Sequence, residues 1–488
     1  MRYCAPSLLP LLAVQALLAL LAQAGVITTT VDLASLVVDN VEALTVQGAA
    51  FNDVLGDKIS AAGDVNGDGF PDFILGCKRH DGGNPNPNHD SGAAYIIFGQ
   101  AGGLTGTLDL TRFDLADASF SRDLNGYVIR STANQFFLAS TISAAGDLNK
   151  DGYDDIIVGA ASGFADLDVA NFVTSDTTGF LIKNGPNQDG AGIVYVLYGR
   201  TSGFADVDEA NFVTSDATGF TITGAADGDA VGYSLSGAGD VNNDGFDDLL
   251  TSAFRSSPKG RDFAGIVYLL FGKATGVADV DLLGFVSSDS VGFVIQGAAS
   301  FDLLGYSLSG AGDVNNDGYA DIIVGAYQAA PSGAAVVLFG KASGFVDVDL
   351  LTDFAPGDST GFSVVGAGTG SYLGFSVAGA CDVNGDGYAD VIVSALLGDP
   401  SGSRTEAGAV YVILGKAAGF ADVDVATFVP SASTGFIIQG ANSEDYLGSS
   451  VACAGDMNGD GIDNVMVGAS NVDNENGNNA GEVYLIID

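Results

Sequence analysis

One nine-residue pattern of oxygen-bearing side chains recurs six times along this chain. In every copy Asp or Asn stands at positions 1, 3, 5 and 9, and position 6 is glycine. Hard cations such as Ca²⁺ take about six to eight oxygen ligands. Glycine at position 6 permits a backbone turn through which the carbonyl of position 7 can join those side chains. The repetition therefore predicts up to six Ca²⁺ sites.

The predicted ligands share these positions, and residue 7 contributes its backbone carbonyl. In chain order they are Asp64, Asn66, Asp68, Phe70 and Asp72; Asp147, Asn149, Asp151, Tyr153 and Asp155; Asp240, Asn242, Asp244, Phe246 and Asp248; Asp313, Asn315, Asp317, Tyr319 and Asp321; Asp382, Asn384, Asp386, Tyr388 and Asp390; and Asp456, Asn458, Asp460, Ile462 and Asn464. The last copy ends on Asn rather than Asp, so it offers one carboxylate fewer than the others.

These loops differ from an EF-hand, which needs Glu at position 12 and flanking helices. Position 12 is an apolar residue or Thr in every copy, as at Val324. That residue ends the β-branched run Ile322–Val324, which is typical of a strand. Each loop is therefore predicted to join two strands.

The composition excludes several classes of partner. The chain has 488 residues, 60 acidic against 17 basic, and a formal net charge of −43. Apolar residues make up 47%, enough for a core, so the acidity does not indicate disorder. This charge argues against binding to a nucleic acid backbone or an anionic membrane surface, and it favours cation uptake.

Residues 1–24 have the organisation of a secretory signal peptide. Arg2 supplies a positive start, Leu8–Leu21 an apolar run, and Ala22–Ala24 a small-residue cleavage site. The alternative is a membrane anchor, but the run is short and interrupted. No later stretch is long and apolar enough to span a bilayer. We predict a mature chain, residues 25–488, that is secreted, or periplasmic if the source is bacterial.

Three cysteines remain after the signal peptide: Cys77, Cys381 and Cys453. An odd number at dissimilar repeat positions does not indicate a disulfide framework. Cys381, for example, stands where other copies have Gly before the loop. We predict that the cysteines are small buried residues replacing Gly or Ala.

Around each loop the chain repeats one four-stranded unit. In the best-defined copy the predicted strands are 292–298, 304–312, 321–326 and 334–340, and residues 344–350 link to the next copy. Successive loops begin 69 to 93 residues apart. Four short strands repeated at this scale are typical of β-propeller blades. The fold is predicted to be all-β, a propeller of six four-stranded blades, with seven as the alternative.

The two ends of the sequence complement each other. With the strand that precedes the cation loop counted as the first, the last unit stops at 481–487, its third strand, while residues 31–36 and 43–49 match the linker and fourth strand of a unit. The N-terminal strand is thus predicted to complete the last blade, closing the ring and removing an open sheet edge.

With its loops of the form Asp-x-Asn/Asp-x-Asp-Gly-x-x-Asp, the unit resembles the FG-GAP repeat of the integrin α-subunit β-propeller. The resemblance covers residues 25–488, although the name-giving dipeptides have become Leu304-Gly305 and Gly325-Ala326 in the best-defined copy. Integrin propellers have seven blades, whereas six loops are present here. The segment 162–180 nearly duplicates 202–220 but lacks a cation loop, so we interpret it as a duplicated linker and strand. The resemblance implies cation-binding loops and a role in extracellular recognition.

Enzymatic motifs are scarce in this sequence. No nucleophile elbow, P-loop or His-Glu-x-x-His motif is present. His80 and His89 share one Gly/Asn/Pro-rich loop, which is either a metal site or, as we predict, a solvated loop. The Asp-x-Asp pairs of the linkers, which either hold further ions or form acidic turns, are Asp206/Asp208, Asp279/Asp281, Asp347/Asp349 and Asp422/Asp424.

The loops between the second and third strands must emerge opposite the cation loops. Seven of the seventeen basic residues lie there, and the candidate ligand-face residues among them are Lys78, Arg79, Arg255, Lys259 and Arg261. In so acidic a chain this grouping indicates a recognition face for an anionic partner. The alternative is ordinary variable surface loops.

These features predict a secreted, Ca²⁺-binding β-propeller that recognises an extracellular protein or glycan, as an adhesion or scaffold module. We expect a binding protein rather than an enzyme. The alternative is a polysaccharide-active hydrolase or lyase, or a lectin, built on a Ca²⁺-stabilised propeller. Paired carboxylates converging away from the cation loops would favour the enzyme.

Overall fold

The computed structural model is all-β, in several sheets, as predicted. It describes residues 31–32, 42–48, 53–80, 92–100, 106–110, 126–130, 138–146, 155–160, 193–197, 219–273, 278–399, 401–473 and 478–487. Within these ranges the helical elements are two 3₁₀ turns, η3 (Pro258–Gly260) and η4 (Leu282–Gly284). No helix in this described part is long and apolar enough to cross a membrane. The predicted signal peptide and the segment 162–180 lie outside it.

The described sheets repeat one topology in which each strand pairs with the next. One sheet contains β12 (Leu235–Gly239), β13 (Asp248–Ala253), β14 (Ile266–Leu270), β16 (Gly292–Gln296) and β20 (Val348–Asp349). The next contains β17 (Ser307–Gly312), β18 (Asp321–Ala326), β19 (Ala334–Leu338), β21 (Gly361–Val365) and β25 (Val423–Asp424). Four strands are antiparallel, and the short fifth strand joins the edge in parallel.

The fifth strand of each sheet belongs to the linker that follows the next sheet's third strand. This parallel pairing joins neighbouring sheets at their outer edges. The same arrangement recurs in the sheet of β22 (Leu373–Cys381), β23 (Asp390–Ala395), β24 (Ala409–Ile413), β26 (Gly435–Gln439) and β1 (Val31–Asp32). Here the outermost strand comes from the N-terminal part of the chain.

The last sheet combines both ends of the described chain. It contains β27 (Leu447–Gly455), β28 (Asn464–Ala469), β29 (Glu482–Ile487), β2 (Glu42–Gln47) and β6 (Gly106–Asp109). The N-terminal β2 pairs antiparallel with β29 over six residues. The predicted pairing of the N-terminal strand with the last unit is therefore observed.

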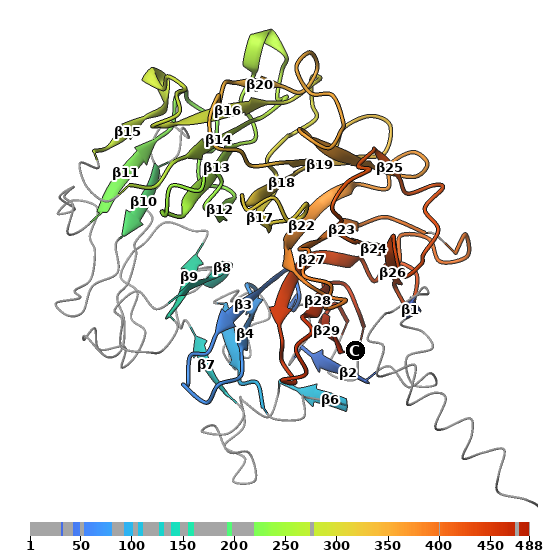
Figure 1. Cartoon of the computed structure of the whole chain (residues 1–488). Coiled ribbons are helices and arrows are strands. Elements are labelled where there is room, and N and C mark those ends of the chain that lie inside the picture. Colours follow the sequence, from blue (N-terminus) through green and yellow to red (C-terminus); the bar gives the residue numbers. More distant parts are fainter. Residues whose placement is uncertain are drawn as a thin grey trace, which may run out of the picture.

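The remaining described strands form smaller sheets. These are β3 (Lys58–Gly63), β4 (Asp72–Cys77), β5 (Ala93–Ile97) and β7 (Gly126–Arg130); β8 (Leu138–Gly146) with β9 (Asp155–Ala160); and β10 (Ile193–Leu197), β11 (Gly219–Thr223) and β15 (Val280–Asp281). In Figure 1 the sheets surround a common centre, with the first strand of each innermost, an arrangement consistent with a β-propeller.

The core lies between adjacent sheets, which explains why the second strands are apolar on both faces. Every residue of β18 is buried. Val337 from one sheet packs in the same cluster as Val391 and Tyr411 from the next. The first and last sheets pack in the same way, since Phe73 and Tyr95 share a cluster with Leu485.

Candidate cation-binding loops

The predicted loops occupy one end of the sheets, where the innermost strand turns into the second. Each is named here by its first residue. Loops 64, 240, 313, 382 and 456 are described, whereas the ligand side chains of the loop at 147–155 lie outside the described residues. A register shift precedes the turn, as between Gly310 and Gly312, and Gly312 has a φ of +69°. This bulge turns the chain away from the sheet and into the loop.

In loop 313 the carboxylate at position 1 accepts hydrogen bonds from backbone N–H groups of the same loop. Asp313 Oδ1 accepts from Asp317 N at 2.9 Å, and Asp313 Oδ2 accepts from Gly318 N at 2.8 Å. Gly318 has a φ of +91°, so this position needs glycine. The equivalent bonds in all five described loops measure 2.9–3.0 Å and 2.7–2.8 Å. The sequence pattern thus corresponds to one repeated loop conformation.

Positions 3 and 5 are bound to each other in the same loop. Asn315 Nδ2 donates to Asp317 Oδ2 at 3.0 Å, and Asn315 Oδ1 accepts from Asp317 N at 2.9 Å. Tyr319 N, at position 7, donates to Asp317 Oδ1 at 3.1 Å. The oxygens of positions 1, 3 and 5 therefore gather on one side of a turn, with the carbonyl of position 7 next in sequence.

Position 9 is the most deeply buried member of each described set. Asp321 is 0% exposed, and its carboxylate accepts from Val314 N at 2.8 Å and from Gly340 N at 2.9 Å. Burial, together with the smaller effect of the nearby charges of Asp317 and Asp313, raises the pKa of Asp321 to about 8 despite these hydrogen bonds. Burial likewise raises the pKa of Asp72 to about 7, of Asp248 to about 6 and of Asp390 to about 7.

These carboxylates fit a divalent cation. The charges of Asp313 and Asp317 act on the buried Asp321 carboxylate, and this repulsion is what an ion of charge +2 would offset. All of the ligand atoms are oxygens, which a hard cation such as Ca²⁺ prefers, whereas softer metals prefer nitrogen or sulfur ligands. Such an ion would be held by positions 1, 3, 5, 7 and 9, as the sequence predicts.

Loop 456 departs from the others at position 9. Asn464 Oδ1 accepts from Met457 N at 2.9 Å, which reproduces one of the two bonds made by the equivalent Asp residues. Among the described residues, its buried Nδ2 has no hydrogen-bond partner. This loop therefore lacks one carboxylate, and the buried Nδ2 of Asn464 finds no acceptor in the described part of the chain.

The Asp-x-Asp pairs fasten the linkers onto the sheets. The first Asp of each pair accepts from the backbone N–H of a fourth strand, as Asp279 does from Thr221 and Asp422 from Ser363, both at 2.8 Å. The second Asp begins the following turn, as Asp424 accepts from Ala426 N at 2.9 Å. The pairs are thus bonded to the protein itself. Asp206 and Asp208 lie outside the described residues.

The basic candidates of the ligand face have intramolecular contacts. Lys259 Nζ lies 2.7 Å from Asp349 Oδ2, and Arg261 Nη1 lies 3.0 Å from Asp349 Oδ1. Asp349 is only 2% exposed, so the expectation that this linker pair is a solvated acidic turn is wrong for Asp349. Lys78 pairs with Asp57 at 2.6 Å.

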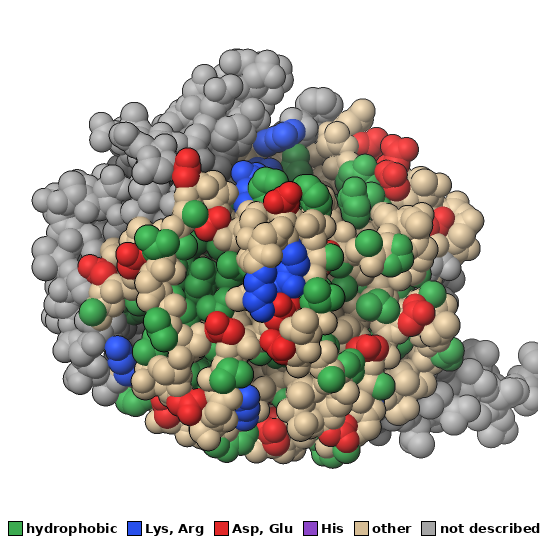
Figure 2. Space-filling model, turned by 90° about the horizontal axis from the view of Figure 1, so that it is seen from above, with side chains coloured by type: hydrophobic (Ala, Val, Ile, Leu, Met, Phe, Trp, Pro, Cys, Tyr) green, Lys and Arg blue, Asp and Glu red, His purple; other side chains and the backbone are tan. Residues whose placement is uncertain are grey.

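The two remaining candidates, Arg79 and Arg255, are exposed. The Arg255 guanidinium lies 5.2 Å from the centre of the Phe254 ring. Figure 2 shows Lys and Arg side chains in small groups beside Asp and Glu rather than as one basic surface. Three of the five candidates, Lys78, Lys259 and Arg261, are thus already paired with carboxylates of the chain itself.

Two further expectations from the sequence are corrected. His80 is 3% exposed, with Nδ1 3.3 Å from Asp53 Oδ2, so it is buried and not part of a solvated loop. His89 lies outside the described residues. Cys381 and Cys453 form a disulfide, whereas Cys77 is buried outside any disulfide, as predicted.

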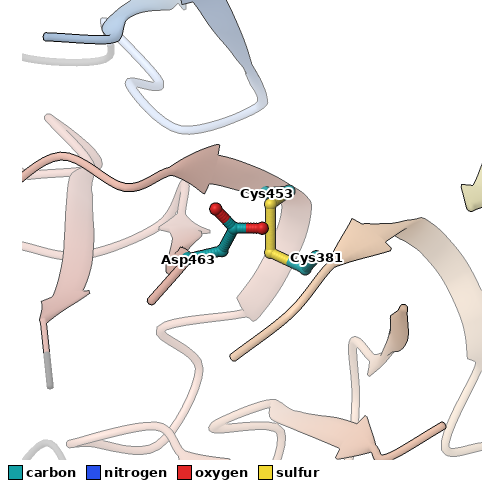
Figure 3. Close-up of side chains that lie close together, drawn as sticks. All are labelled: Cys381, Cys453 and Asp463. Carbon is teal, nitrogen blue, oxygen red and sulfur yellow. A yellow bond between two sulfur atoms is a disulfide. The ribbon is translucent and has the colours of Figure 1, made fainter. Parts of the chain in front are cut away.

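The disulfide connects the innermost strands of two neighbouring sheets beside two cation loops. Cys381 ends β22 directly before loop 382, and Cys453 lies in β27 shortly before loop 456. Figure 3 shows the Asp463 carboxylate beside the two sulfurs, and Cys381 Sγ, Cys453 Sγ and a carboxylate oxygen of Asp463 lie within 4.8 Å of one another.

A strip of aromatic side chains at the opposite end of the strands was not predicted. Its members lie just before or at the start of the first strands, or directly after the second strands, of three sheets, and they are Tyr233, Phe254, Tyr306, Tyr327, Tyr372 and Phe375. The ring centres of Tyr306 lie 5.2 Å from Tyr233 and 4.4 Å from Tyr327. An aromatic residue recurring after Leu/Val-Gly, as at Tyr233, Tyr306 and Phe375, is the sequence signal that would have indicated it.

Comparison with known proteins identifies the repeat. Residues 231–270, 304–338 and 373–413 match the FG-GAP repeat. The chain is similar to integrin alpha pat-2 of Caenorhabditis briggsae (32% identity over 170 residues, 32% of this chain and 12% of that protein). It is also similar to integrin alpha-PS2 of Drosophila melanogaster (31% over 194 residues, 36% and 12%).

A longer match is to integrin alpha pat-2 of Caenorhabditis elegans, at 32% identity over 282 residues, which is 58% of this chain and 18% of that protein. The matched region thus spans less than a fifth of each of these three relatives. The likeness therefore concerns the repeat region and not the whole of an integrin subunit.

Proposed function

Because the chain is an FG-GAP repeat protein of the integrin α-like type, we propose that it is an adhesion-type binding module. In this proposal residues 25–488 form a secreted β-propeller of six blades, closed into a ring by the N-terminal strand. Ca²⁺ in the loops stabilises the ring, and the ligand is an extracellular protein or glycan. The support comes from the family, the repeated loops and the pairing of β2 with β29.

The observation that carries the proposal is the aromatic strip. It lies at the ends of the strands opposite the cation loops, since Tyr233 precedes β12 whereas loop 240 follows it. Tyr233 is 46% exposed, and Tyr306, Tyr327 and Phe375 are half-buried. Aromatic side chains with one polar tip dominate binding surfaces because they offer large contact area at low conformational cost.

The strip is held in place before any ligand arrives. Its rings support one another across three sheets, as Phe375 lies 5.2 Å from Tyr306 and 5.5 Å from Tyr327. A preorganised surface loses little side-chain entropy on binding. Arg255, stacked on Phe254 at the margin of the strip, is placed to meet an acidic group of the ligand. The proposed partner is therefore still anionic, but its proposed contact surface is the aromatic strip rather than the basic loops.

The test is a binding screen of residues 25–488 on protein and glycan arrays, followed by variants. Tyr233→Ala with Tyr306→Ala should weaken binding about tenfold or more, because truncated anchors typically cost over about 1 kcal/mol each. The matched control is Leu283→Ala with Val286→Ala, which removes equally apolar side chains, each 76% exposed, from a linker. Normal binding by the strip variant would place the ligand elsewhere.

A further inference from the structure

Adjacent cation loops are joined by a backbone hydrogen bond. The N–H of position 8 in one loop donates to the carbonyl of position 1 in the loop of the preceding sheet. Ala320 N donates to Asp240 O at 3.1 Å, Ala389 N to Asp313 O at 3.2 Å, and Asp463 N to Asp382 O at 3.1 Å. The described loops 240, 313, 382 and 456 therefore form one connected series.

The series meets a different residue at the junction with the first sheet. Position 8 of loop 64 is Pro71, which has no N–H to donate. Pro71 still occupies the same place, because a Cβ on Gly455 would lie 3.5 Å from Pro71 Cγ, as one on Gly312 would lie 2.6 Å from Ala389 Cβ. The packing is kept at this junction, and the hydrogen bond is not.

We infer that loops 240, 313, 382 and 456 bind cations cooperatively through these bonds and that the coupling stops at Pro71. Position 8 lies between two predicted ligands, the carbonyl of position 7 and the carboxylate of position 9. A bound ion fixes that segment and with it the N–H that holds position 1 of the neighbouring loop. The neighbour then has less backbone to order when its own ion binds, which is positive coupling.

The junction between loops 382 and 456 has additional connections. The Asp463 carboxylate accepts from Asp382 N at 2.9 Å, so the two loops exchange two hydrogen bonds. The disulfide between Cys381 and Cys453 joins the strands that lead into them (Figure 3). Coupling should therefore be strongest here. Asp463 is a positioning residue in this scheme, with its carboxylate bonded to the backbone of the other loop.

Terbium luminescence can report single loops, because tyrosine sensitises a nearby bound ion. Tyr153, Tyr319 and Tyr388 are the tyrosines at position 7. Position 7 side chains also lie against the preceding loop, as Phe70 does against Gly459, so loop 240 is emptied by Asp244→Ala. A chain with this change, Tyr153→Phe and Tyr388→Phe then reports loop 313 through Tyr319. Emptying loop 382 with Asp386→Ala should then weaken terbium binding at loop 313 about fivefold, the value of one ordinary hydrogen bond.

The bond itself is tested by Ala389→Pro in the same reporter chain. Pro71 shows that the loop accepts proline at this position, and Lys416 N still donates to Val314 O at 3.0 Å across the same junction. With Ala389→Pro, Asp386→Ala should have no further effect on loop 313. Ala389→Ser, which keeps the N–H, is the matched control and should retain the fivefold effect.

The reverse change is Pro71→Ala, which supplies the missing N–H between loops 456 and 64. It should raise the Hill coefficient of a calorimetric Ca²⁺ titration above that of the parent chain. This inference depends on the proposed Ca²⁺ sites, and the two fail differently. Absence of any cation binding overturns both, whereas independent filling of the loops, or coupling that survives Ala389→Pro, overturns the inference alone.

Discussion

Asn464 differs from the other position 9 residues in charge and in hydrogen bonding. Its Nδ2 is buried without a partner among the described residues, whereas Asp321 uses both oxygens. We expect loop 456 to fill last in a Ca²⁺ titration, because it has one carboxylate fewer. Asn464→Asp should tighten its binding, while in chelator the extra buried charge should destabilise the fold by about 1–2 kcal/mol.

Calorimetric titration of Asn464→Asp beside Asp460→Ala, which empties the same loop, measures the order of filling. Should loop 456 of the parent chain fill first, the number of carboxylates does not set the order. The repeated loop conformation was predictable from sequence because its hydrogen-bonded positions lie within nine residues of one another. The partner of Arg261 was not predictable from sequence, because Asp349 is 88 residues away. Asp349 reaches Arg261 through the pairing of β20 with β16 of the preceding sheet.

The buried Asp349 carboxylate should make stability depend on acidity. Burial alone would raise its pKa, but hydrogen bonds from Lys259 and Arg261 prevail and lower the pKa to about 2. A lowered pKa in the folded state means that the stabilisation is present above about pH 4 and is lost as the pH falls through about 2. Asp349→Asn should therefore cost about 2 kcal/mol at neutral pH and almost nothing near pH 2.

Urea unfolding of Asp349→Asn and the parent chain across this pH range provides the measurement. Asp281→Asn, at the equivalent position of another linker, is the control, because Asp281 is exposed and its carboxylate caps its own turn by accepting from Leu283 N at 3.0 Å. A difference between Asp349→Asn and the parent that is independent of pH would contradict the ionic origin of the effect.

At the scale of strands, the repeat pattern was sufficient for most of the fold. The predicted strand 321–326 coincides with β18, and the predicted 304–312 begins three residues before β17. The disulfide was missed because Cys381 and Cys453 occupy different positions in their repeats. They meet because β22 and β27 pack side by side with an offset, which the spacing along the chain does not reveal.

The disulfide should stabilise the pair of sheets that it joins. It closes a loop with a sequence separation of 72, for which chain entropy gives about 4 kcal/mol. Cys381→Ser with Cys453→Ser should lower the free energy of unfolding by about 2–4 kcal/mol. Chemical denaturation with and without a reductant measures this difference in the free energy of unfolding. Cys77→Ser is the control, because it replaces a cysteine that is not part of the disulfide. Equal stability of oxidised and reduced parent chain would show that packing alone holds these sheets together.

At the scale of the whole molecule, the sequence predicted that both ends meet in one sheet. Glu42–Gln47 pairs with Glu482–Ile487, and the hydrophobic cluster of Tyr95 and Leu485 joins the first and last sheets. The blade number stays a prediction, because the segment 162–180 and most of its near-duplicate 202–220 lie outside the described residues. Either of two near-identical segments can form the same strand of a repeat, so the sequence pattern alone does not decide which segment pairs with the neighbouring strand.

Calcium should stabilise the proposed ring as a unit. When free Ca²⁺ is ten times the Kd, each occupied site adds about 1.4 kcal/mol to the free energy of unfolding. Six sites add about 8 kcal/mol if they act within one cooperative fold. For a chain of this size that corresponds to a melting temperature about 8 °C lower in excess chelator, and added Ca²⁺ should restore it. The strip variant Tyr233→Ala with Tyr306→Ala should show the same drop, because the strip lies at the other end of the strands. An unchanged melting curve in chelator would contradict a structural role for calcium, and a smaller drop in the strip variant would show that the two ends are coupled.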